Sequence, residues 1–198
     1  MSAGLRLPIT MALAERALVF QALIAATEAT DIEGARHDTE KSMLDVVAAL
    51  KELRERQGRL YLVGNGGSAA VASHAATDLL NVGGLRAATL HDPALLSCMS
   101  NDYGFENAFA RLVATLASPG DMLIAISSSG QSANIRNAAA EMRKHRGTVV
   151  TLSGFKNDNP LRSLGHVNFW LDSADYGMVE VGHEFVLHNI ADRLRLGL

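Results

Sequence analysis

Two short runs rich in glycine and serine could bind an anion. GNGGS at 64–68 and SSSGQS at 127–132 each follow an apolar stretch and precede a helical pattern. Glycine permits backbone conformations that other residues avoid, so several N–H groups can converge on one anion at the positive end of the following helix. Serine hydroxyls add neutral donors, which predicts a phosphate site that needs no Lys or Arg. Either run alone is also explained by a tight turn or a helix cap, and Ser68 is expected to be an N-cap.

The same two runs argue against a nucleotide cofactor. Neither carries the lysine of a P-loop, and neither spells the three-glycine fingerprint of dinucleotide-binding folds. The candidate phosphate-binding residues in the two runs are Gly66, Gly67, Ser68, Ser127, Ser128, Ser129 and Ser132.

A second group of residues could coordinate a metal ion or transfer protons. His74 and Asp78 lie four residues apart in one helical pattern, and Glu180, Glu184 and His188 follow one another at four-residue steps in the last one. Residues at this spacing share one face of a helix. Two histidines with carboxylates can hold a divalent ion or divide general-base and general-acid roles. Each set by itself is more often a solvated helix face.

The rest of the chain predicts the α/β scaffold that positions these residues. Short apolar runs alternate with helical patterns, which is the βαβ rhythm of a parallel sheet covered on both faces. Such sheets bind ligands beyond the carboxyl ends of their strands, where both Gly/Ser runs lie. The predicted strands are 59–63, 85–90, 121–127, 147–152 and 166–171, and the predicted helices are 8–28, 34–56, 68–81, 104–117, 131–145 and 176–195.

A chain of 198 residues is expected to form one structural domain. Within it, residues 1–56 are interpreted as an N-terminal helical segment for oligomerisation and residues 57–198 as the α/β core. The run ALVFQALIAA at 17–26 is similar to a signal-peptide core, but Glu15 and Arg16 precede it. Its apolar residues recur at helical spacing, which favours an amphipathic helix.

Composition excludes several classes of ligand. The 18 basic and 21 acidic residues give a net charge of -3 without a Lys/Arg stripe, so direct nucleic-acid binding is not expected. No apolar run approaches the length that crosses a bilayer, so membrane insertion is not expected either. The single Cys98 cannot form an internal disulfide. Its apolar neighbours predict a buried thiol in a protein of the reducing cytoplasm.

Four motifs in this chain resemble those of a known enzyme family: GNGGSAAVASHAATDL, SNDYGFE, GDMLIAISSSGQSANI and EVGHEFVLH. Their order and spacing are similar to those of the phosphoheptose isomerases, the sedoheptulose 7-phosphate isomerases of the sugar-isomerase (SIS) superfamily. The resemblance extends from the N-terminal helices to about Leu194. It implies a single SIS domain with a flavodoxin-like, five-stranded parallel sheet, helices on both faces and N-terminal helices. It also implies a cytoplasmic homotetramer with active sites shared between subunits.

The resemblance further implies roles for individual residues. Asn65 and Asp102 are expected in the sugar pocket, and Glu180 is expected to contact substrate. Asp78 is expected to be the catalytic base, with His188 as its acid partner. The implied phosphate ligands are Ser68, Ser127, Ser129 and Ser132, and the implied zinc-binding set is His74, Asp78, Glu180 and His188.

Four positions depart from the pattern of the family. Asp78 stands where the family has Glu, Glu180 where it has Gln, Val71 where it usually has Asp, and Val82 where it usually has Arg. Asp is one methylene shorter than Glu, and a general base displaced by about 1 Å can lose about a hundredfold in rate. Two histidines with two carboxylates also make a more anionic metal site.

The predicted activity is an aldose–ketose isomerisation of a phosphosugar through an enediol. The leading hypothesis is interconversion of sedoheptulose 7-phosphate and D-glycero-D-manno-heptose 7-phosphate. Two alternatives stay open: an isomerase of another sugar phosphate, and a non-catalytic SIS protein that associates with the bacterial replication initiator. The retained His74, Asp78 and His188 argue against the non-catalytic protein, whereas Val71 and Val82 argue for some divergence.

Overall fold

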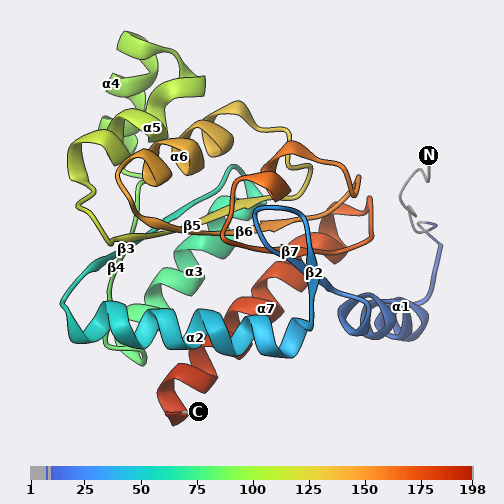
Figure 1. Ribbon diagram of the computed structural model, residues 1–198. Helices are drawn as coiled ribbons and strands as arrows, with labels where there is room; N and C mark the ends of the chain where they lie inside the picture. The colour runs from blue at the N-terminus through green and yellow to red at the C-terminus, as the bar shows by residue number, and fades with distance from the viewer. Residues whose placement is uncertain (1–7, 9, 198) are drawn as a thin grey trace.

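The computed structural model, which describes residues 8 and 10–197, contains a seven-stranded mixed sheet with helices on both faces (Figure 1). The strands lie in the order β2-β1-β7-β6-β5-β3-β4. Five consecutive strands of that order are parallel, and they match the five predicted strands to within one residue at each end. They are β3 (Arg59–Val63), β4 (Arg86–Thr89), β5 (Met122–Ser127), β6 (Thr148–Ser153) and β7 (Val167–Trp170).

The prediction of a purely five-stranded parallel sheet was wrong at one edge. There β1 (Glu28–Thr30) pairs antiparallel with β7, and β2 (Arg36–His37) pairs antiparallel with β1. The chain turns between them at Gly34, which has a φ of 81°. Strands of three and two residues are too short to show an alternating pattern. The sequence analysis therefore left most of β1 between the predicted helices 8–28 and 34–56 and assigned β2 to the start of the second.

The helices form a layer on each face of the sheet, with α2, α3 and α7 on one side and α5 and α6 on the other (Figure 1). One helix, α4, was not predicted; none of its described residues is buried, although Leu96 and Met99 pack partly against the core. The α-helices are α1 (Leu13–Ala25), α2 (Thr39–Glu55), α3 (Gly67–Asn81), α4 (Pro93–Tyr103), α5 (Phe105–Leu116), α6 (Ala133–Lys144) and α7 (Tyr176–Leu196), and a 3-10 turn, η1, spans Pro160–Ser163.

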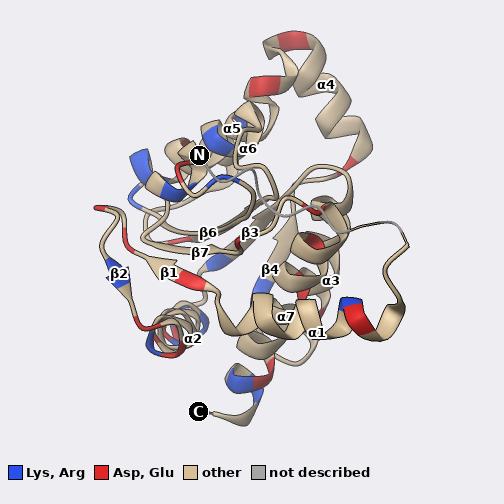
Figure 2. Ribbon diagram, turned by 90° about the vertical axis from the view of Figure 1, so that its right-hand side faces the viewer, with Lys and Arg blue, Asp and Glu red and all other residues tan. Residues whose placement is uncertain are grey.

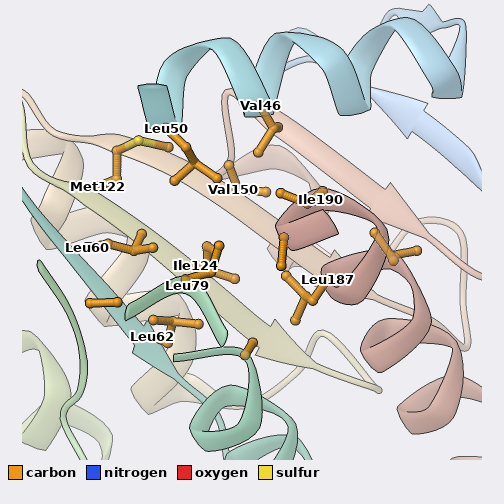
Figure 3. Packing of buried hydrophobic residues seen from close by; sticks show 14 of the residues in the cluster. Val46, Leu50, Leu60, Leu62, Leu79, Met122, Ile124, Val150, Leu187 and Ile190 are labelled. Atoms are coloured by element: carbon orange, nitrogen blue, oxygen red, sulfur yellow. The ribbon is translucent and has the colours of Figure 1, made fainter. Parts of the chain in front are cut away.

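Alternate residues of each central strand enter two separate cores, as a sheet covered on both faces requires. Leu60 and Ile124 belong to the core under α2, α3 and α7, whereas Tyr61 and Leu123 belong to the core under α5 and α6. Figure 3 shows the first of these cores, with strand residues meeting side chains from all three helices, such as Leu79 of α3. The two cores fix α3 against the sheet and thereby fix the site residues that it carries.

The N-terminal segment is less buried than the predicted amphipathic helix. In α1 the buried residue is Leu23, which packs with Leu171 and Met178, while Leu13 and Leu18 are 85% and 67% exposed. Residues 1–7 and 9 of the predicted oligomerisation segment lie outside the described residues. None of the described helices is long and apolar enough to cross a membrane.

The expectation of a buried Cys98 was wrong. Its thiol is exposed, because α4 projects from the body of the molecule (Figure 2). Figure 2 also shows basic and acidic segments interspersed over the visible elements, without a continuous basic stripe in that view.

Candidate active site

The two Gly/Ser runs meet at the carboxyl edge of the sheet. They follow β3 and β5, which are neighbours in the sheet although β4 lies between them in the chain. This is a topological switch point, where open α/β sheets form ligand crevices. A cavity of about 280 Å³ opens there. Its lining residues are Asn65, Gly66, Gly67, Ser68, Ile126, Ser127, Ser128, Ser129, Ser132, Tyr176 and Glu180.

Both helices that start at this cavity begin without a side-chain cap. Gly66, with a φ of 54°, is the N-cap of α3, and Ser132 is the N-cap of α6. The prediction that Ser68 caps α3 was therefore wrong by two positions; Ser68 lies inside the first turn and is buried. Neither cap residue hydrogen-bonds its helix through a side chain, so N–H groups of both first turns remain for an anion.

The serines of the second run supply hydroxyls at different depths of the cavity. The Ser127 and Ser132 hydroxyls lie 3.3 Å apart, and Ser129 Oγ accepts a hydrogen bond from the backbone N–H of Gln131 at 3.2 Å. Ser128 Oγ is buried and has no hydrogen-bond partner among the described residues. A buried hydroxyl without a partner is uncommon, which marks this position at the cavity wall as a candidate for a functional role.

Two residues outside the predicted set hold the turns in place. Asn134 at the start of α6 exchanges two 2.9 Å amide hydrogen bonds with Asn65, which ties one turn to the other. The N–H of Gly64 donates to Nε2 of His91 at 3.2 Å, and burial lowers the pKa of His91, which favours the neutral acceptor. No local sequence signal marks either residue, because each acts on a segment distant in the chain.

A ring of alternating imidazoles and carboxylates lies further along α3, where α7 packs beside it. Asp78 Oδ2 lies 3.5 Å from His74 Nε2 and 3.2 Å from His188 Nδ1. On the other side, Glu184 Oε1 lies 3.5 Å from His74 Nδ1 and 3.4 Å from His188 Nε2. The tertiary structure thus brings together His74, Asp78 and His188, as the sequence analysis expected, and adds Glu184.

Glu184 is the member to which the sequence analysis gave no role. Its four-residue spacing from Glu180 and His188 was visible, but spacing alone does not tell which of two acids on one helix face meets α3. Burial raises the pKa of the Glu184 carboxyl, and attraction to His74 and His188 acts in the opposite direction. The carboxylate is therefore held in a partly desolvated position by its two imidazole neighbours.

Glu180 lies at the other end of the helix pair. It lines the Gly/Ser cavity, and a methyl group added at Gly67 would collide with its carboxylate. Asp102, on the projecting α4, is exposed, accepts a hydrogen bond from Asn101 and does not line the cavity. Of the two valines at departing positions, Val71 is buried in the core and Val82 is exposed at the end of α3.

Comparison with known proteins confirms the predicted resemblance. Residues 23–154 match the SIS domain family. The phosphoheptose isomerase of Trichlorobacter lovleyi is 34% identical over 172 residues, which cover 80% of this chain and 87% of that protein. The phosphoheptose isomerase of Helicobacter pylori is 31% identical over 181 residues, which cover 88% of this chain and 93% of that protein.

Solved structures support the same fold. A phosphoheptose isomerase from Francisella tularensis superposes with a TM-score of 0.80 at 24% identity, covering 92% of this chain and 94% of that one. The enzyme from Neisseria gonorrhoeae gives a TM-score of 0.75, also at 24% identity, and covers 92% and 98%. With the Gly/Ser cavity and the His/carboxylate ring in place, the family matches establish that this chain belongs to the phosphoheptose isomerases of the SIS-domain family.

Proposed function

We propose that this protein is an aldose–ketose isomerase that interconverts sedoheptulose 7-phosphate and D-glycero-D-manno-heptose 7-phosphate. One observation carries the proposal: an anion cavity rich in hydroxyls and a ring of two imidazoles and two carboxylates lie about two turns apart along the same helix pair, α3 and α7. The cavity suits a phosphate and the ring suits proton transfer. The relatives named above are phosphoheptose isomerases, which supports the same substrate.

The spacing of the two parts fits a long sugar. From Gly67 to His74 the axis of α3 rises about 10 Å. Six C–C bonds of about 1.5 Å each, in an extended chain that ends in a phosphate, cover a similar distance. A heptose 7-phosphate can therefore place its phosphate at the Gly/Ser turns and its C1 and C2 atoms at the ring, whereas a triose phosphate is too short.

Asp78 is the proposed base, and His188 is its acid partner. Asp78 removes a proton from C1 of the ketose, beside the C2 carbonyl, which gives the enediol, and it returns the proton to C2 to give the aldose. His188, whose Nδ1 lies 3.2 Å from Asp78, moves the second proton between O2 and O1. The cavity residues and the first-turn N–H groups hold the phosphate, so C1 and C2 stay within reach of these groups.

The ring also fits a zinc-type divalent ion. Imidazole and carboxylate are the ligands of such ions, and Glu184 Oε1 is a buried acceptor without a hydrogen-bond partner among the described residues. His74 and His188 would hold the ion together with carboxylate from the ring. When bound, the ion would supply positive charge that stabilises the oxygens of the enediolate.

We further propose a homotetramer that acts in the cytoplasm. Apolar side chains on α1 and α7 remain exposed in the single chain, among them Leu13, Leu18, Val181 and Phe185. Phe20 and Phe185 already stack edge to face at a centroid distance of 6.2 Å, so the two helices present one surface. Size-exclusion chromatography with light scattering tests the assembly, and a monomeric mass would contradict it.

The activity is tested by incubating the zinc-supplemented protein with sedoheptulose 7-phosphate in heavy water and recording proton spectra. Deuterium uptake beside the carbonyl together with new anomeric signals is the expected result. Exchange without a product would support the base but contradict the proposed sugar. The absence of both signals from folded, metal-loaded protein would overturn the isomerase.

A further inference from the structure

We propose that Glu184 is the carboxylate ligand of the metal site, with His74 Nδ1 and His188 Nε2 as the other two ligands. Asp78 then lies outside the metal's first coordination sphere and positions the two imidazoles. This inference rests on the proposed function for the kind of ion, a zinc-type divalent cation. It concerns a residue that the family pattern does not use, and it assigns the second carboxylate of the ring to a different task.

Glu184 lies where one of its oxygens and one nitrogen of each imidazole could bind the same ion. Its Oε1 lies 3.5 Å from His74 Nδ1 and 3.4 Å from His188 Nε2. One ligand atom from each of the three residues falls within 4.8 Å of the others. Two imidazoles and one carboxylate, with a fourth position open, is a common ligand set of catalytic zinc sites.

The Oε1 atom of Glu184 is buried, and its polar neighbours are the two imidazoles. Oε1 makes no hydrogen bond within the described part of the chain, although the side chain is only 23% exposed. The imidazoles at 3.5 and 3.4 Å are ion-pair partners only when protonated, so beside neutral imidazoles this desolvated oxygen lacks a charged partner, which is costly. An ion between Glu184 and the two imidazoles would provide that partner.

Asp78 faces the opposite nitrogen of each ring. Its Oδ2 lies 3.5 Å from His74 Nε2 and 3.2 Å from His188 Nδ1, which are the nitrogens left over when Glu184 and the metal use the other side. Metal-binding imidazoles usually donate their second N–H to such a carboxylate, which fixes the ring orientation. One acid outside the coordination sphere can therefore orient both ligands and remain available to take a proton from substrate. In the zinc-loaded protein both nitrogens of His188 are engaged, so Asp78 also takes over the proton transfer between O1 and O2.

Glu180 is the competing candidate on α7. It lies one turn before Glu184, lines the Gly/Ser cavity and faces Gly67, and it does not belong to the His/Glu/His group found among the described residues. A metal ligand at Glu180 would require its side chain to leave that cavity. The contacts of the two glutamates thus divide α7 into a substrate end and a metal end.

The test is a competition titration of metal-free protein with zinc and a chromophoric chelator. We expect Glu184→Gln to weaken zinc binding by about a hundredfold or more, since even second-shell substitutions cost about 10–100-fold. Glu180→Gln removes the same charge one turn away and should change the affinity by less than about threefold. Asp192→Asn, at an exposed acid of the same helix, is the control for net charge. Circular dichroism of each metal-free variant checks that it is folded.

Two results would overturn the inference. One is a Glu180→Gln variant that loses as much affinity as Glu184→Gln, and the other is wild-type protein without a stoichiometric zinc site. A zinc-loaded crystal structure of the wild type decides the matter if Glu184→Gln does not fold: Glu184 Oε1 should lie about 2.0–2.2 Å from zinc. The zinc titration does not depend on catalysis. Zinc binding through Glu184 without deuterium exchange in heavy water would contradict only the isomerase activity. Deuterium exchange without zinc binding would contradict only the metal site.

Discussion

The two ends of the α3–α7 pair differ in the proportion of titratable side chains that form them. At the start of α3 the cavity is formed mainly by backbone N–H groups, hydroxyls and the Asn65 amide, with Glu180 as its acidic lining residue. Further along, the ring around His74 and His188 consists entirely of titratable groups. The first end suits a group that must be held without reacting, and the second suits atoms that exchange protons. The four predictions below test this division, beginning with the largest expected effect.

Replacing Asp78 with Asn should nearly abolish turnover. The amide cannot accept the substrate proton, and loss of a general base costs about 10²–10⁴-fold, so we expect kcat to fall about a thousandfold while KM changes little. The measurement is steady-state kinetics with sedoheptulose 7-phosphate. Asp45→Asn, at an exposed acid of α2, should keep wild-type kinetics. A kcat for Asp78→Asn within tenfold of wild type would place the base elsewhere.

The pH dependence of folding should report His183, a histidine of α7 that lies outside both ends of the site. His183 is fully buried with Nε2 3.1 Å from the Ser153 carbonyl, and burial lowers its pKa from 6.5 to about 4. Because the unfolded chain binds this proton first, stability is complete above pH 6.5 and is lost as the pH falls to about 4. The free energy of unfolding should drop by about 3 kcal/mol over that window.

Chemical denaturation at a series of pH values measures this loss. His183→Gln should give a flatter dependence between pH 6.5 and 4, since the substituted side chain does not titrate. Equal slopes for the variant and the wild type would show that other groups cause the effect.

Breaking the tie between the two Gly/Ser turns should destabilise the cavity end. Asn134→Ala leaves the Asn65 amide without its partner and should cost about 1–3 kcal/mol in the free energy of unfolding, with a higher KM. Asn137→Ala on the same helix removes an amide bonded to the Glu106 carbonyl and should cost about 1 kcal/mol or less. Equal losses for the two variants, measured by urea unfolding, would contradict a special role for Asn134.

The smallest effect is expected from a single hydroxyl of the cavity. Ser129→Ala removes one of several neutral donors and should raise KM about tenfold or less, since a neutral hydrogen bond contributes about 0.5–1.5 kcal/mol. The value of kcat should stay unchanged, because this group binds ground state and transition state alike. A large fall in kcat would show that the cavity end also takes part in chemistry.

Local sequence signals identified the scaffold and the cavity end. Five buried apolar runs predicted β3 to β7, because strands covered on both faces need continuous hydrophobic residues. The runs 64–68 and 127–132 predicted the anion cavity, because glycine and serine act through the backbone of their own turn. The sequence misled at α4: its few apolar residues did not reveal a helix that buries none of them fully, and Cys98 has apolar neighbours but is exposed.

The proton-transfer end depends on the packing of two helices that are about a hundred residues apart. The sequence by itself determined that His74 shares a face with Asp78 and that Glu180, Glu184 and His188 share another, since a helix repeats every 3.6 residues. It could not determine which turn of α7 lies beside which turn of α3. That register is fixed by the core beneath both helices, and it alone decides that Glu184 meets the imidazoles while Glu180 faces Gly67.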